Sequence, residues 1–320
     1  MTETEILFDL LEKGISPAHA VSACEKRLTD AGFEVVDYGT AWNLKAGGKY
    51  VVNHHETTLF AFTLPQNWSD REPAIRIAAA HTDFPCLRIK PSCDIQTNGY
   101  AQVNVEVYGG AILNTWLDRP LGVAGRVAVR SEDVFTPEVV TFQSEKNLMT
   151  IPNLAIHMNR EVNKGVELNK QTELLPICGL SDDADYFLDF LVKELAVKKE
   201  DILDFELTIY NKEKPEFVGL NDEFISASRL DNLNSCSALV SAIIESDRAD
   251  GMNLIALFDH EEIGSRSKQG AGSILLHDML VRILTECGLE KKCGTDCTTA
   301  SFYPWMWHMD FIQTMPERWI

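Results

Sequence analysis

The chain has 320 residues, of which 45% are hydrophobic and 24% charged, as is ordinary for a globular protein of one or two domains. Its formal net charge of −19 argues against a nucleic-acid-binding surface, which needs clustered Lys and Arg, and against anionic membranes. No apolar stretch approaches the roughly 20 residues of a membrane span, and the N-terminus lacks the basic and apolar regions of a signal peptide. We therefore expect a cytoplasmic protein with no nucleic-acid or membrane partner.

The eight cysteines are too few and too scattered for a disulfide framework. Only Cys293 and Cys297 lie close together, and no second pair completes an all-cysteine zinc site. We therefore expect reduced thiols rather than a cysteine-bound metal.

The predicted elements begin as alternating helices and strands. Ser16 and Pro17 suit the start of a helix and Gly32 suits its end, which predicts a surface helix over 16–32. Apolar segments predict strands at 48–53, 57–64 and 74–80. The third of these strands leads directly into His81.

From about residue 93 to 226 the pattern changes to short β-rich segments joined by turns and polar runs. The alternating pattern then returns, with predicted elements at 233–247 (helix), 254–258 (strand) and 271–288 (helix). This order predicts an α/β fold in which a catalytic domain, residues 1–92 and 227–300, is interrupted by a β-rich insertion, residues 93–226.

The most informative segment is the end of the strand at 254–258. Asp259, His260, Glu261 and Glu262 follow its last apolar residue. In α/β sheets, ligands bind at the carboxyl ends of the strands. Two adjacent carboxylates there are costly unless a cation neutralises one of them and chemistry uses the other, as in metal-assisted hydrolysis. The alternative is a solvated acidic loop.

Two other segments place metal-type ligands at the ends of elements. His81 and Asp83 project to the same side of an extended chain, so that the carboxylate could orient a ligand imidazole. Asp231 lies at the entry to a helix, where an N-cap is its commoner role. Each segment has a structural explanation when taken alone, but the three together favour a metal-dependent active site.

In this order the motifs resemble those of the aspartyl aminopeptidase family of co-catalytic zinc metallopeptidases. The matching blocks are AAHTDFP with Lys90-Pro91, the run from Gly109-Gly110 to Val127, AIHMNR at 155–160, RLDN at 229–232 and DHEEIGS at 259–265, continued by QGA at 269–271. The resemblance covers roughly residues 1–300. It implies an enzyme that removes N-terminal residues from peptides, with members that prefer Asp or Glu and others of broader specificity.

The resemblance also implies roles for individual residues. His81 would bind one zinc ion, Asp231 would bridge two, and Glu262 would bind the second. Glu261 would be the general base, and Asp83 would tune His81. Cobalt or manganese are alternative metals for such a donor set.

The same resemblance implies a fold and an assembly. The expected fold is the zinc-peptidase mixed sheet flanked by helices, with residues 93–226 as a dimerisation insert, in a large homo-oligomer. His157 lies in this insert and would contact substrate or metal at the active site, in its own subunit or across an interface.

The segment 301–320 departs from the family. It contains three of the six Trp and three of the eight Met. The family has here a segment of the type Ser-x-Asp-x-Ala-His-x-x-His-Pro-Asn, whose Asp is a zinc ligand. Reading the codons of this segment from their third base allows Leu-Ser-Met-Asp-Val-Ala-His-Gly-Phe-His-Pro-Asn-Tyr-Ala, which contains that motif. We infer a frame slip between about 298 and 302.

This inference predicts an incomplete catalytic domain that lacks ligands and sheet strands, and therefore impaired or absent activity. The competing interpretations of the chain are a non-catalytic oligomeric scaffold or a degraded gene product. A natural aromatic tail that docks a partner is the alternative explanation of residues 301–320.

The gene sequence tests the frame slip directly. We expect a coding sequence in which the frame shifted near codon 300 encodes the missing motif. An open frame that encodes this tail, with no such motif in the shifted frame, would contradict the inference.

Overall fold

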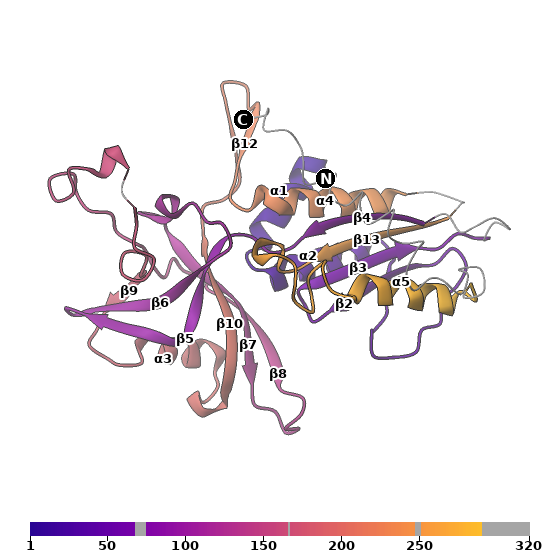
Figure 1. Ribbon diagram of the computed structural model, residues 1–320, viewed down its shortest axis with the longest axis horizontal. Helices are drawn as coiled ribbons and strands as arrows, with labels where there is room; N and C mark the ends of the chain where they lie inside the picture. Colours follow the sequence, from indigo (N-terminus) through magenta and orange to yellow (C-terminus); the bar gives the residue numbers. More distant parts are fainter. Residues whose placement is uncertain (68–74, 166, 247–250, 290–320) are drawn as a thin grey trace. The chain divides into compact units, whose positions relative to one another are not determined.

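The computed structural model describes residues 1–67, 75–165, 167–246 and 251–289 (Figure 1). The chain divides into two compact units. The first contains Met1–Ile6, Val21–Thr82 and the residues from Asn232 onward, and the second contains Leu7–Ala20 and Asp83–Asp231. The predicted boundary at 92/93 falls inside a strand, β5 (Cys86–Thr97), rather than between elements. The functional roles of the two parts stay a prediction.

The described part of the first unit holds a five-stranded mixed sheet. Its strands are β1 (Glu34–Val35), β2 (Lys49–His54), β3 (Thr58–Thr63), β4 (Ile75–His81) and β13 (Met252–Phe258), in the order β1-β2-β3-β13-β4. Strand β13 runs antiparallel to β3 and parallel to β4. The segments predicted as strands at 48–53, 57–64, 74–80 and 254–258 are therefore confirmed, as is the mixed α/β class.

Helices cover the faces of this sheet (Figure 1). Helix α5 (Leu275–Glu286) packs its apolar side on alternate residues of β2, β3 and β13, and Phe60, Phe62 and Leu254 lie in that core. The intervening strand residues are also buried, as a sheet covered on both faces requires. Helices α2 (Pro17–Asp30) and α4 (Leu230–Glu245) are linked by the bond from the Arg27 guanidinium to the Ser241 hydroxyl.

The second unit is built on an antiparallel sheet of six strands over the described residues. The strands β5, β6 (Tyr100–Tyr108), β7 (Leu121–Val129), β8 (Glu138–Gln143), β9 (Ile177–Leu180) and β10 (Ile202–Asn211) lie in the order β8-β7-β10-β5-β6-β9. The register of β5 against β6 shifts between Ile89 and Asp94. Pro91 lies inside this shift, where its missing N–H removes a ladder donor. The β-rich character of this region agrees with the sequence analysis.

Helix α3 (Tyr186–Leu195) lies within the β-rich region and was not predicted from the sequence. Phe187 and Leu191 of this helix lie in the core of the second unit. The Asp94 carboxylate accepts hydrogen bonds from the amides of Phe187 and Leu188, at 2.7 and 3.3 Å, and so satisfies the first turn of the helix. This cap comes from a residue 93 positions away, whereas Asp185 at the N-cap position makes no side-chain capping bond.

The remaining elements are short or lie at the start of the chain. They are α1 (Glu3–Lys13), the hairpin of β11 (Glu216–Val218) and β12 (Phe224–Ser226), and the 3-10 turns η1 (Leu113–Trp116), η2 (Val162–Lys164), η3 (Lys199–Asp201) and η4 (Glu261–Ile263). Among the described helices, none combines the length and the apolar character needed to cross a membrane.

The cysteines of the described residues are free thiols, as the sequence analysis expects. Burial raises the pKa of Cys24 and of Cys86 to about 12, so both stay protonated at neutral pH. The pair Cys293 and Cys297 and the predicted tail at 301–320 lie outside the described residues.

A glycine sets the contact between β7 and β10. Gly125 has a φ of +149°, and a Cβ built there would lie 2.0 Å from the Glu206 carbonyl oxygen. We expect Gly125→Ala to lower the free energy of unfolding by about 2–4 kcal/mol, through strain and overpacking. Urea denaturation measures this, with Gly110→Ala as control, because a Cβ at Gly110 meets nothing within 4 Å. Equal effects of the two substitutions would contradict the prediction.

Candidate functional site

The pairing of β4 with β13 brings two of the predicted site segments to one edge of the first sheet. The strands are parallel, and Phe258 is the register partner of His81. His81 is therefore the last residue of β4, and the quartet from Asp259 to Glu262 follows the last residue of β13. The carboxyl ends of both strands thus meet at one edge, as expected for a ligand site in an α/β sheet.

Hydrogen bonds from Thr82 hold the chain after His81. Its amide donates to the Phe258 carbonyl at 2.8 Å, and its hydroxyl donates to the Thr57 carbonyl at 2.8 Å. The thiol of Cys236, on α4, donates to the His81 carbonyl at 3.1 Å. The backbone on which the imidazole stands is therefore tied to β13, to the β2–β3 turn and to α4.

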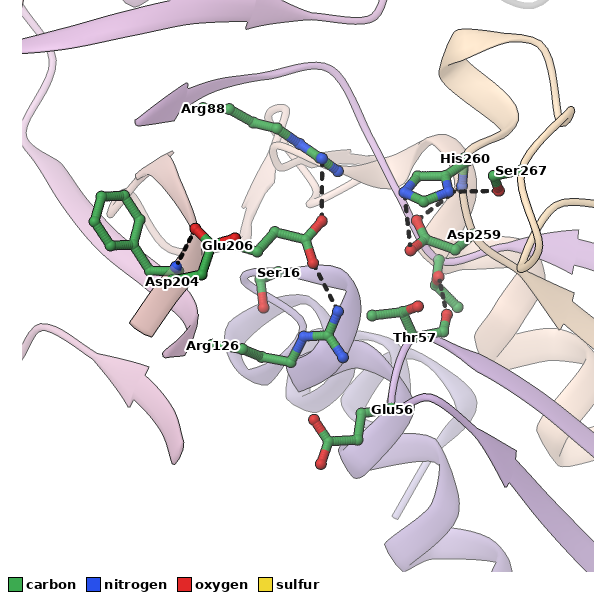
Figure 2. A network of polar contacts seen from close by, with 12 residues as sticks. Ser16, Glu56, Thr57, Arg88, Arg126, Asp204, Glu206, Asp259, His260 and Ser267 are labelled. Carbon is green, nitrogen blue, oxygen red and sulfur yellow. Dashed lines mark hydrogen bonds and ion pairs between the residues drawn. The ribbon is translucent and has the colours of Figure 1, made fainter. Parts of the chain in front are cut away.

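The first half of the quartet shapes the turn after β13. His260 has a φ of +64°, and its amide donates to the Asp259 carboxylate at 2.8 Å. Its imidazole contacts the Ser267 hydroxyl at 2.6 Å and the Asp259 carboxylate at 3.4 Å (Figure 2). The side chain of Asp259 is 1% exposed. Asp259 and His260 therefore hold the turn that carries the two glutamates.

The same turn requires a close backbone approach at Gly270. The amide of Gly272 donates to the Ser265 carbonyl at 3.0 Å, and a Cβ on Gly270 would lie 2.2 Å from that carbonyl oxygen. The amide of Asp259 also donates to the Gln269 carbonyl at 3.3 Å. Residues 265–272 thus fold back onto the start of the turn and fix its shape.

The structure brings His81 and Glu261 together. The imidazole Nε2 of His81 lies 3.8 Å from a carboxylate oxygen of Glu261. The His81 side chain is 10% exposed and that of Glu261 is 30% exposed, so the carboxylate remains reachable from solvent while the imidazole is buried. The acidic segment is therefore not a free solvated loop, because one of its carboxylates faces the histidine of the neighbouring strand. Glu262, the next residue in η4, is half-buried.

Asp83 is held by a residue that the sequence analysis did not identify. The Tyr108 hydroxyl donates to the Asp83 carboxylate at 2.7 Å, and both residues are buried. The guanidinium of Arg88 lies over the Tyr108 ring, 3.8 Å from its centroid. The place of Tyr108, directly before the Gly109-Gly110 motif, was the only available signal for this role.

A charged network continues from Arg88. Its guanidinium lies 3.0 Å from the Glu206 carboxylate, which also accepts a bond of 2.6 Å from Arg126 (Figure 2). Two cations on the strands that flank β10 thus share one carboxylate, and Arg88 is fixed where it stacks on Tyr108. This network comes from β5, β7 and β10, so only the tertiary structure assembles it.

Asp231 and His157 both belong to the second unit, whereas His81 belongs to the first. Asp231 is exposed in the first turn of α4. Arg229, two residues earlier, has a φ of +65° and donates to the Leu11 carbonyl at 2.8 Å. Burial lowers the pKa of Arg229 to about 10, which leaves it charged at neutral pH. His157 is exposed in a turn closed by the bond from the Met158 amide to the Ala155 carbonyl.

The donor types at the strand ends suit zinc, which binds imidazole and carboxylate groups. A catalytic zinc site takes three protein ligands and one water or substrate. Within the described ranges, no three His, Cys, Asp or Glu side chains are grouped as a metal site would require. The chemistry of the donors at the strand ends therefore fits the metal.

The contact between Tyr108 and Asp83 is testable through stability. We expect Tyr108→Phe to lower the free energy of unfolding by about 1–3 kcal/mol, because a buried carboxylate loses a donor. The matched control is Tyr100→Phe on the same strand, where the side chain is 46% exposed and a change within about 0.5 kcal/mol is expected. Urea denaturation of both variants checks this, and an unchanged midpoint for Tyr108→Phe would refute it.

Comparison with known proteins identifies the family of the chain. The family model described as aminopeptidase I zinc metalloprotease (M18) matches residues 10–303. The probable M18 family aminopeptidase 2 of Clostridium novyi is 41% identical over 291 residues, which cover 89% of this chain and 67% of the relative. The protein of the same name from Pseudomonas aeruginosa strain UCBPP-PA14 is 41% identical over 286 residues, or 88% and 66%. The chain thus spans about two thirds of the length of these relatives.

Solved structures agree with this placement. The Chaetomium thermophilum protein mApe1 superposes with a TM-score of 0.82 at 29% identity, over 92% of this chain and 71% of that one. The M18-family aminopeptidase of Thermotoga maritima gives a TM-score of 0.77 at 21% identity, over 89% and 64%, which shows the shared fold. From the matched motifs, the identity to curated relatives and the fold, we conclude that the chain belongs to the M18 family of zinc metallo-aminopeptidases.

Proposed function

We propose that the chain carries the site of a zinc-dependent aminopeptidase that removes N-terminal residues, with Asp or Glu as the preferred residues, from peptides. The observation that carries this proposal is the approach of Glu261 to His81 at 3.8 Å, where β4 and β13 end side by side. Family membership supplies the reaction class.

In this proposal His81, Asp231 and Glu262 hold the metal, as the family motifs imply, and His157 contacts substrate or metal. Zinc is the proposed ion, with cobalt or manganese as alternatives. When bound, such a metal polarises the peptide carbonyl and lowers the pKa of a bound water to about 7.

The residues of the chain supply the proton transfers and the positioning. Glu261 accepts a proton from the attacking water and passes it to the departing amine, as a general base that then acts as an acid. Its partial exposure keeps its carboxylate accessible to substrate, whereas the buried His81 keeps one orientation. Asp83, held by the Tyr108 hydroxyl, tunes His81 in the manner of an outer-shell carboxylate.

We also propose that activity is impaired in the chain as given. Segment 301–320 lacks the motif in which the family places a further ligand. Strand β4 is the outermost strand of its sheet over the described residues, and Ile75 and Ile77 on it are half-buried. An outer parallel strand of this kind is prone to pairing with other chains.

Assembly into a homo-oligomer is part of the proposal. One solved relative is the yeast mApe1 dodecamer. In the second unit of this chain, Ile156 and Met158 flank His157 and are 53% and 67% exposed, and nearby Leu154 is 53% exposed. Exposed apolar side chains around a predicted site residue suit an interface between copies.

A second candidate is a non-catalytic scaffold that keeps the family fold. The absence from segment 301–320 of the family motif that carries a further ligand favours it. The amount of tightly bound zinc separates the two candidates. About two tightly bound zinc ions per chain favour the enzyme, and none or one weakly bound ion favours the scaffold.

Zinc binding by variants tests the site. We expect His81→Gln to weaken zinc binding by about 10–100-fold, since it removes a ligand. The matched control is His277→Gln on α5, a histidine of the same unit whose side chain is 43% exposed, and it should bind zinc like the parent. Competition with a chromophoric chelator gives the affinities, and equal affinities for both variants would argue against the site.

Peptidase assays test the function and its impairment. We expect little release of an N-terminal Asp, Glu or Leu from zinc-loaded chain, and loss of any residual rate in Glu261→Gln with zinc affinity retained. Robust zinc-dependent release by the 320-residue chain would overturn the proposed impairment. A rate that survives Glu261→Gln would overturn the assignment of the base.

A further inference from the structure

A pocket of about 200 Å³ lies in the second unit, where α1, β8 and the end of β10 meet the segment before α4. Its apolar part includes Ile15 and Tyr210, which are 2% and 4% exposed and form a small core cluster with Ala124. The volume is below the roughly 300–1,000 Å³ of pockets for drug-sized molecules, so only a compact ligand fits.

Charged residues dominate the rest of the lining, which includes Lys212, Lys214, Arg229, Glu12 and Glu213. Three of these charges are balanced by partners. Lys214 pairs with Glu12 at 3.2 Å, and the Glu213 carboxylate accepts a bond of 2.7 Å from Arg119. The remaining two cations are Lys212 and Arg229, and whether they are paired with carboxylates decides whether the pocket attracts an anion.

Lys212 has no carboxylate partner within the described part of the chain. Its ammonium group donates to two backbone carbonyls, those of Ser144 at 2.9 Å and Glu145 at 2.8 Å. These dipoles orient the group without cancelling its charge. An ammonium group has three N–H donors, so one donor of Lys212 remains after these two bonds.

Arg229 also has no carboxylate partner among the described residues. Over the described residues its guanidinium donates to the carbonyls of Leu11 and Asn211 and to the Ser228 hydroxyl, all neutral groups. Its buried Nε–H has no hydrogen-bond partner there. Arg229 and Lys212 each lie 5.9 Å from the centroid of the same Tyr210 ring. Two cations without a carboxylate partner among the described residues therefore line one pocket beside the same tyrosine ring, in a chain whose net charge is −19.

We propose that this pocket binds a small oxyanion, of the phosphate or compact dicarboxylate class, between Lys212 and Arg229. An oxyanion supplies the negative charge and the acceptors that the neutral carbonyls do not. Arg and Lys are the side chains that bind phosphate and carboxylate oxygens most strongly, because their hydrogen bonds are charge-assisted. Partial removal from water strengthens the attraction relative to an exposed pair.

Anion binding in this pocket requires neither zinc nor peptidase activity, so calorimetric titration of the metal-free chain tests it. The probes are inorganic phosphate and succinate, each compared with sodium chloride at matched ionic strength, because screening alone also changes the stability of an acidic chain. We expect saturable one-site binding of phosphate, of succinate, or of both, and the stronger of the two identifies the anion class. Heats that match those of sodium chloride would overturn the proposal.

Charge variants locate the bound anion. We expect Lys212→Met to weaken binding at least tenfold and Glu213→Gln to tighten it about threefold, because the first removes a cation and the second a carboxylate from the lining. The control is Lys164→Met, an exposed lysine of the same unit that lies outside the pocket lining, and its affinity should stay within twofold.

Glu213→Gln keeps the test valid if Lys212→Met fails to fold, because the Glu213 side chain is 48% exposed. Binding that follows net charge alone, with equal losses in Lys212→Met and Lys164→Met, would contradict the assignment. Binding unchanged in both Lys212→Met and Glu213→Gln would contradict it as well.

Discussion

The parallel pairing of β4 with β13 is the constraint on which the candidate site depends. The register that sets Phe258 opposite His81 brings the end of one strand beside the start of the acidic turn, although 180 positions of sequence separate His81 from Glu261. A slip of one residue would turn the alternating side chains of a strand to the opposite face. The buried faces of β13 prevent such a slip, because Leu254, Ala256 and Phe258 pack in the core shared with α5. The burial that stabilises the sheet therefore also aligns His81 with Glu261.

Beyond the strand ends, the site relies on residues whose role is to hold other residues. The polar groups of Asp259 and His260 form hydrogen bonds within the turn that presents Glu261. Tyr108 holds Asp83 and is itself stacked under Arg88, which Glu206 fixes from the next strand. Buried polar groups need such partners, since a lost partner leaves the full cost of desolvation. This explains why the motifs of the family extend beyond the residues that would touch a metal.

The acidic chain uses its cations in two different ways. Arg88 and Arg126 share the Glu206 carboxylate, so their charges are balanced inside the fold. Among the described residues, Lys212 and Arg229 donate only to neutral acceptors, although glutamates line the same pocket. The difference is one of geometry, because those glutamates already pair with Lys214 and Arg119. A net charge of −19 therefore does not describe the local field at every surface of this molecule.

The sequence by itself determined strands β2, β3, β4 and β13 and helices α2, α4 and α5, the β-rich character of the second unit and the residues at the strand ends. Apolar runs that end abruptly in ionisable groups carry that information locally. Prediction from the sequence failed at α3. The dense apolar run of this helix, YFLDFLVKEL, lies among predicted strands, and the distant Asp94 caps its first turn. Only the tertiary structure decided that Glu261 faces His81, that Tyr108 holds Asp83, and that Lys212 and Arg229 share a pocket. These contacts join residues far apart in the chain, and their distances depend on sheet register and packing, which no local pattern encodes.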